Sequence, residues 1–67
     1  MLRGIVKWFN ERKGLGIIVP AGDHTNNVVV LSPSIAAPSR ALRQGEAVAY
    51  ELDPERPNLV RLVIVTK

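Results

Sequence analysis

The chain has 67 residues, with nine Lys and Arg against six Asp and Glu, which gives a net charge of +3 and a pI near 10.0. This length supports one domain at most, and so short a chain buries only about 60% of the surface that its unfolded form exposes. Without any Cys, and with His24 as the one His, it has neither disulfides nor the ligands for a zinc site.

The basic balance favours polyanionic partners, although charge of this size alone fits simple solubility equally well. We expect no secretory signal, because Arg3, Gly4 and Lys7 interrupt any apolar stretch near the start. Strongly apolar runs without charge, such as Val28–Leu31, are far shorter than the roughly 20 residues of a membrane helix. We therefore expect a cytoplasmic protein with no membrane partner, and the missing Cys fits a reducing compartment.

Short runs rich in β-branched residues, divided by turn formers, predict strands over most of the chain. The predicted strands cover residues 2–10, 15–19, 28–31, 46–52 and 59–65. Pro20 should end the second strand, since proline cannot donate to a ladder, and a polar loop that holds His24 follows it. Near residues 33–37 we expect one helical turn, with Ser32 as N-cap and Pro33 at the first helical position. Five strands of this spacing are typical of a small barrel or sandwich.

No arrangement of side chains predicts an enzyme. The sequence has no Ser/His/Asp or Cys/His set, and the carboxylates at residues 51–55 lie in a predicted turn, where solvation is the simpler interpretation than acid–base catalysis. The run from Gly14 to Gly16 lacks the further glycine and the helix of a dinucleotide loop.

The most informative stretch is GIVKWFN at residues 4–10, followed by KGLGII at residues 13–18. A lysine beside an indole suits single-stranded nucleic acid, because the cation meets phosphate while the ring stacks on a base. The alternative, equally open on chemistry alone, is that Trp8 and Phe9 belong to the core.

These two runs, at this separation, resemble those of the bacterial cold-shock proteins, and weaker likeness continues over nearly the whole chain. The resemblance implies an all-β fold, a five-stranded antiparallel OB-like barrel over residues 1–67, and binding of single-stranded RNA or DNA without a cofactor. It also implies RNA chaperoning or gene regulation, including under cold stress. The positions that match the family are Lys7, Trp8, Phe9, Asn10, Lys13, Gly14 and Gly16, with Arg56 as a basic residue in the last long loop.

The chain departs from the family where aromatic rings are expected. Leu15 and Ile17 stand in place of Phe, while Val29, Leu31 and Ser32 replace a Phe, a His and a Phe. Stacking is worth about 1–3 kcal/mol per base, so losing the four Phe removes, even at the low end of this range, roughly 4 kcal/mol, or about a thousandfold in affinity. We expect weak, salt-sensitive binding with little base preference.

The predicted nucleic-acid site consists of Lys7, Trp8, Phe9, Lys13, Leu15, Ile17, Val29, Leu31 and Arg56. Since several replacements remain apolar, an exposed patch for a protein partner or a second copy of the chain is an alternative. A third interpretation shifts the register by one residue and puts these side chains in the core. The predicted core is Val6, Ile18, Val28, Val30, Ile35, Leu42, Val48, Tyr50 and Val63.

Overall fold

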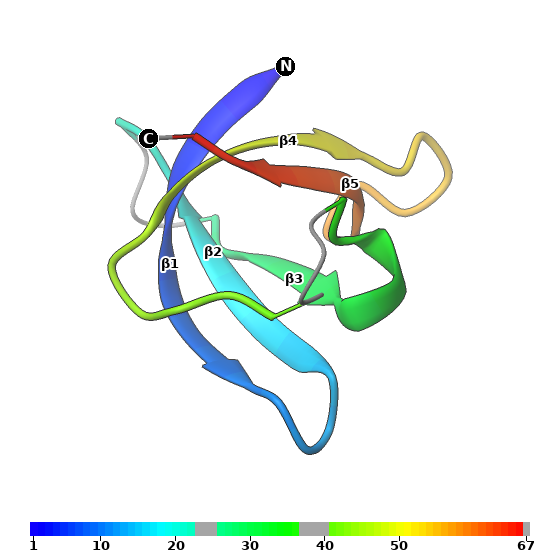
Figure 1. Cartoon of the computed structure of the whole chain (residues 1–67). Coiled ribbons are helices and arrows are strands. Elements are labelled where there is room, and N and C mark those ends of the chain that lie inside the picture. Colours follow the sequence, from blue (N-terminus) through cyan, green and yellow to red (C-terminus); the bar gives the residue numbers. More distant parts are fainter. Residues whose placement is uncertain (23–25, 37–40, 67) are drawn as a thin grey trace.

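A computed structural model describes residues 1–22, 26–36 and 41–66. In this part of the chain one five-stranded sheet has the order β3-β2-β1-β4-β5, and every neighbouring pair is antiparallel (Figure 1). Its elements are β1 (Leu2–Asn10), β2 (Leu15–Pro20), β3 (Val28–Leu31), the 3-10 helix η1 (Ser32–Ser34), β4 (Ala47–Leu52) and β5 (Val60–Val65). The described residues contain no helix with the length and apolarity needed to cross a bilayer.

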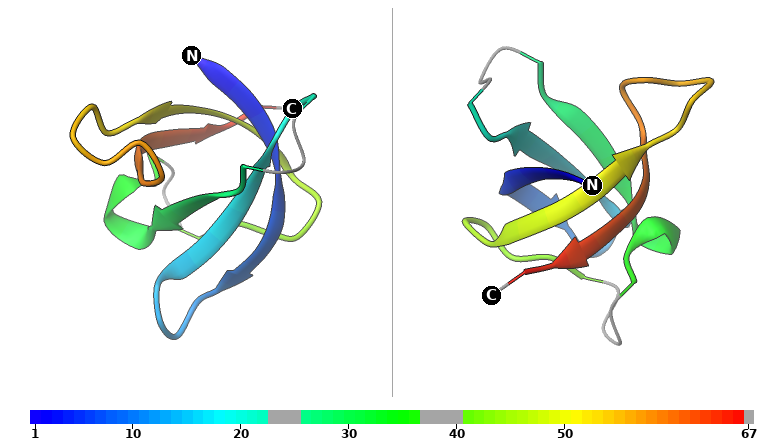
Figure 2. Two further views of the ribbon diagram at one scale, coloured as in Figure 1. Left: turned by 180° about the vertical axis from the view of Figure 1, so that it is seen from behind. Right: turned by 90° about the horizontal axis from the view of Figure 1, so that it is seen from above.

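The sheet curls until its two outer strands approach each other, as the two views of Figure 2 show. Isolated parallel bridges join Val29 to Leu59 and Ile35 to Val63, so the β3 side of the sheet meets the β5 side. The amide of Val29 donates to the carbonyl of Asn58 at 2.8 Å, which fixes the β4–β5 loop beside β3. This closure confirms the predicted antiparallel OB-like barrel.

The interior of the barrel is filled by aliphatic side chains around Tyr50, which is 1% exposed. All nine residues predicted for the core are buried, and the described part adds Ala49 and Val60 to them. Alternation along β4 puts Ala49 on the opposite face from Val48 and Tyr50, yet it is buried as they are. It lies between Arg3 and Ile64 on the neighbouring strands, and its methyl group is too short to reach past their longer side chains.

The strand ends differ from the predictions by one residue in three places. β2 includes Pro20, which pairs with Gly4 but lies beyond the end of the β2–β3 ladder at Ile18, so its missing donor costs no bond to β3. β4 and β5 each begin one residue later than predicted, at Ala47 and Val60.

The expected helical turn is present but starts earlier than predicted. η1 begins at Ser32, so its N-cap is Leu31, and that cap makes no side-chain hydrogen bond. The amide of Ser32 donates to the carbonyl of Gly14 at 2.8 Å, which ties the start of η1 to the β1–β2 turn. Ala37, at the far end of the predicted turn, and His24 in the predicted polar loop both lie outside the described residues.

Candidate nucleic-acid interface

Two rows of side chains cross the outward face of β1, β2 and β3. Residues paired directly across antiparallel strands project to the same side of the sheet, within contact distance of one another. The pairing gives one row of Trp8, Ile17 and Val29, and a second of Asn10, Leu15 and Leu31. The aliphatic residues that replace the family's rings therefore share a face with the indole.

A β-bulge on β1 brings Trp8 to this face. Val6 is buried and pairs with Ile18, while Trp8 pairs with Ile17. Between these two pairs β1 therefore contains one extra residue that has no partner on β2. Strict alternation from Val6 would turn Trp8 into the core, but the extra residue, Lys7, leaves both Lys7 and Trp8 pointing outward. Trp8 is 41% exposed, which excludes the core interpretation for this residue.

Phe9 takes the opposite side of β1. It pairs with Gly16, which in turn pairs with the buried Val30, and its ring packs against the core cluster. A Cβ at Gly16 would lie 2.6 Å from the Phe9 ring and 2.8 Å from the carbonyl oxygen of Trp8, so glycine is what allows this ring to lie over β2. We therefore remove Phe9 from the predicted stacking surface, because it lies beneath the surface on which Trp8 is exposed.

The β1–β2 turn holds Lys13 beside the second row. The side-chain oxygen of Asn10 accepts the Lys13 amide at 3.1 Å, and its carbonyl accepts the Gly14 amide at 2.9 Å. Gly14 has φ +63°, a conformation that a residue with a Cβ rarely adopts. Asn10 was matched to the family but left out of the predicted site, and it both completes the row and closes the turn.

The β4–β5 loop, which carries Arg56, lies beside β3. The Arg56 amide donates to the carbonyl of Asp53, and its own carbonyl accepts the amide of Leu59 at 2.9 Å. Because Leu59 bridges to Val29, the loop lies against β3. Lys7, Lys13 and Arg56 are all exposed, and within the described ranges no ion pair engages any of them.

The aliphatic members of the face are only partly covered. Leu31 is 39% exposed, while Leu15, Ile17 and Val29 are half-buried. This observation argues against the shifted-register interpretation, which would seal these side chains inside. The result is an exposed apolar strip with one indole and cations at its edges, a surface that can hold flat apolar groups linked by negative charges.

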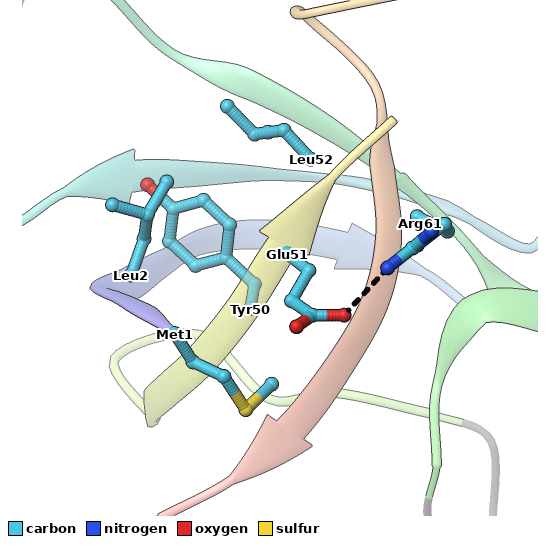
Figure 3. A pocket seen from close by; sticks show the side chains of 6 residues that line it. All are labelled: Met1, Leu2, Tyr50, Glu51, Leu52 and Arg61. Carbon is cyan, nitrogen blue, oxygen red and sulfur yellow. Dashed lines mark hydrogen bonds and ion pairs between the residues drawn. The ribbon is translucent and has the colours of Figure 1, made fainter. Parts of the chain in front are cut away.

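A separate hollow of about 370 Å³ lies by the start of the chain and β4, lined by Met1, Leu2, Tyr50, Glu51, Leu52 and Arg61 (Figure 3). Its charged groups pair with each other, since the Arg61 guanidinium donates to the Glu51 carboxylate at 2.9 Å. Both are well exposed, so the pair is screened by solvent. The described residues contain no cluster of three His, Cys, Asp or Glu side chains suited to a metal ion.

The OB-like barrel, with an indole and cations on one sheet face, defines a class of small nucleic-acid-binding domains. No protein-family model matches the chain. It is 39% identical over 56 residues to the probable cold shock protein y4cH of Sinorhizobium fredii, covering 84% of this chain and 81% of that protein. To cold shock protein CspA of Staphylococcus aureus it is 37% identical over 68 residues, covering 92% and 100%.

A third relative agrees with these two. Cold shock protein CspA of Rhizobium meliloti is 40% identical over 52 residues, which covers 78% of this chain and 75% of that protein. The chain therefore belongs to the cold-shock protein family, whose members bind nucleic acids.

Proposed function

We propose that this chain binds single-stranded RNA or DNA across the outward face of β1, β2 and β3, weakly and with little base preference. The observation that carries the proposal is the exposed indole of Trp8, aligned with Ile17 and Val29 and preceded by Lys7. A ring with one free face and a neighbouring cation is the combination that recognises a base and its phosphate. The function is binding rather than catalysis, and we place it in the cytoplasm.

Each part of the face has a role in this proposal. Trp8 stacks on one base, and the aliphatic residues Leu15, Ile17, Val29 and Leu31 contact others through apolar surface alone. Lys7, Lys13 and Arg56 meet phosphates from two sides of the face. Phe9 packs on the core side of β1 and does not contact the bound nucleic acid.

Weak binding follows from the chemistry of the aliphatic residues. A ring contributes about 1–3 kcal/mol per stacked base, whereas an aliphatic side chain offers only the area that it removes from water. None of the aliphatic side chains carries a donor or acceptor, so they discriminate poorly among bases. Affinity therefore depends largely on Trp8 and on charge.

Replacing Trp8 with Ala should cost more affinity than any other single change, at least about fivefold at 1 kcal/mol of lost stacking. Fluorescence anisotropy of a labelled pyrimidine-rich oligonucleotide measures this without relying on the indole. Ile64→Ala, at a 38% exposed position on β5, is the matched surface control. Equal affinity of the Trp8→Ala variant and the parent would refute the assignment.

A protein partner or a second copy of the chain is the competing function, favoured by the exposure of Leu31 and its half-buried aliphatic neighbours. Analytical ultracentrifugation separates the two. A dimer that Leu15→Glu or Ile17→Glu dissociates would support protein contact, whereas a monomer with salt-sensitive oligonucleotide binding supports the nucleic-acid function.

A further inference from the structure

Another hollow, which is apolar, opens on the outer surface of β1 and β2, which lie side by side in Figure 1. Its volume is about 300 Å³, and it is lined by Ile5, Lys7, Val19, Pro20 and Ala21. Ile5 is 45% exposed and pairs directly with Val19, so these two side chains form its floor. Lys7 is the one charged residue in the lining.

This hollow continues the face that carries Trp8. Along β2, Val19 lies two residues beyond Ile17, a step of about 6.6–6.8 Å on the same side of the strand. Along β1, the bulge at Lys7 separates Ile5 from Trp8, and all three side chains are exposed. A nucleotide stacked on Trp8 therefore has its neighbour within reach of the Ile5–Val19 pair, with Lys7 between the two.

The charges at the two ends of the hollow suit a strand rather than a neutral ligand. Lys7 stands at the Trp8 end. At the other end the Ala21 amide donates to the carbonyl of Arg3 at 2.9 Å, and Arg3 is exposed on the same side of β1 as Ile5. Along β1 a cation is followed by an apolar floor and then by a second cation. This order matches the alternation of phosphate, base and phosphate along a nucleic-acid strand. No acidic residue lines the hollow in the part of the chain that the structure describes.

We propose that the hollow floored by Ile5 and Val19 is an additional base subsite, which holds the nucleotide next to the one stacked on Trp8 and places its flanking phosphates at Lys7 and Arg3. This inference rests on the proposed single-strand function and extends the path of the strand along β1 and β2. Because the floor is aliphatic, the subsite adds affinity without selecting a base.

A length series of oligothymidylates, from about three to about eight nucleotides, tests the subsite by quenching of Trp8 fluorescence. The test variant is Ile5→Thr, and its matched control is Ile64→Thr on β5, which exchanges the same residues at an exposed strand position outside the face. Val19→Thr, which keeps the side chain's shape, is a second test that leaves Ile5 in place.

In the parent and in Ile64→Thr, affinity should rise when the strand becomes long enough to reach the hollow. Ile5→Thr and Val19→Thr should lose that increment, about fivefold or 1 kcal/mol, and bind the shortest strands as the parent does. Identical length profiles in parent and test variants would overturn the subsite while leaving the proposed function intact.

Two further outcomes would also overturn it. If no oligonucleotide quenches Trp8 at any length, the proposed function itself fails and the subsite fails with it. If the free protein self-associates in sedimentation and Ile5→Thr abolishes that association, the hollow is a contact between copies of the chain rather than a base subsite.

Discussion

Trp8 and Phe9 are neighbours in the sequence but belong to opposite sides of β1. Phe9 packs toward the core over Gly16, while Trp8 is exposed in a row with Ile17 and Val29. The extra residue, Lys7, causes this separation. Without it, alternation from the buried Val6 would point Trp8 inward and Phe9 outward. One bulge thus determines which of the two aromatic side chains can meet a ligand.

Lys7 should contribute to binding through charge alone. Neutralising it in Lys7→Gln removes about one phosphate contact, so the slope of log affinity against log salt should become shallower by about 0.7. Oligonucleotide titrations at several salt concentrations measure the slope. Lys13→Gln should behave in the same way. An unchanged slope in Lys7→Gln would mean that this ammonium group touches no phosphate.

Gly16 should tolerate no side chain. A methyl group there meets the Phe9 ring at 2.6 Å and the Trp8 carbonyl at 2.8 Å, and the carbonyl belongs to the backbone and cannot turn aside. We expect Gly16→Ala to lower the free energy of unfolding by about 1–3 kcal/mol, the usual cost of overpacking. Urea denaturation followed by circular dichroism measures it. An unchanged midpoint would contradict the packing described here.

At the scale of elements, the strands were largely predictable because each run of β-branched residues is bounded by turn formers. Residues 2–10 and 28–31 were predicted with the ends that β1 and β3 have. The bulge was not predictable, since nothing in the run around Lys7 distinguishes one extra residue from continued alternation. Phe9 was placed in the predicted site because it matches the cold-shock family at that position, although neighbouring residues of a strand project to opposite faces.

The burial of a side chain by residues on neighbouring strands could not be predicted from the sequence either. Ala49 follows the outward alternation of β4, yet it is 7% exposed because residues far away in the chain flank it. The N-cap of η1 is Leu31 rather than the predicted Ser32 for a similar reason, since the Ser32 amide donates to the carbonyl of Gly14 in the β1–β2 turn. Such effects require the register between strands, which a single sequence does not contain.

Restoring a ring to the β2 strand should tighten binding. Ile17 pairs with both Trp8 and Val29 on the outward face, so Ile17→Phe places a second aromatic surface next to the indole. At about 1 kcal/mol or more per stacked base, affinity should rise about fivefold or more. Ile17→Leu is the control, because it remains apolar without a ring. Equal affinities of the Phe and Leu variants would show that no base stacks at this position.

At the scale of the whole molecule, one face of a very small barrel carries the proposed function. The chain measures 26 × 25 × 19 Å, so three strands make up a large share of its surface. Tyr50 and aliphatic side chains form the core of the described residues. β4 and β5 complete the core on one side, while β1, β2 and β3 combine a buried inner face with an exposed apolar outer one.

The most direct test of this account is a titration of Trp8 fluorescence with a pyrimidine-rich single strand at two salt concentrations. Three phosphate contacts, from Lys7, Lys13 and Arg56, predict a salt slope of about −2, so affinity should fall about twentyfold between about 50 and 200 mM salt. Saturable quenching at the lower salt, weakened to this degree at the higher, is the predicted result. An indole whose emission does not change with added strand at either salt concentration would contradict the central claim.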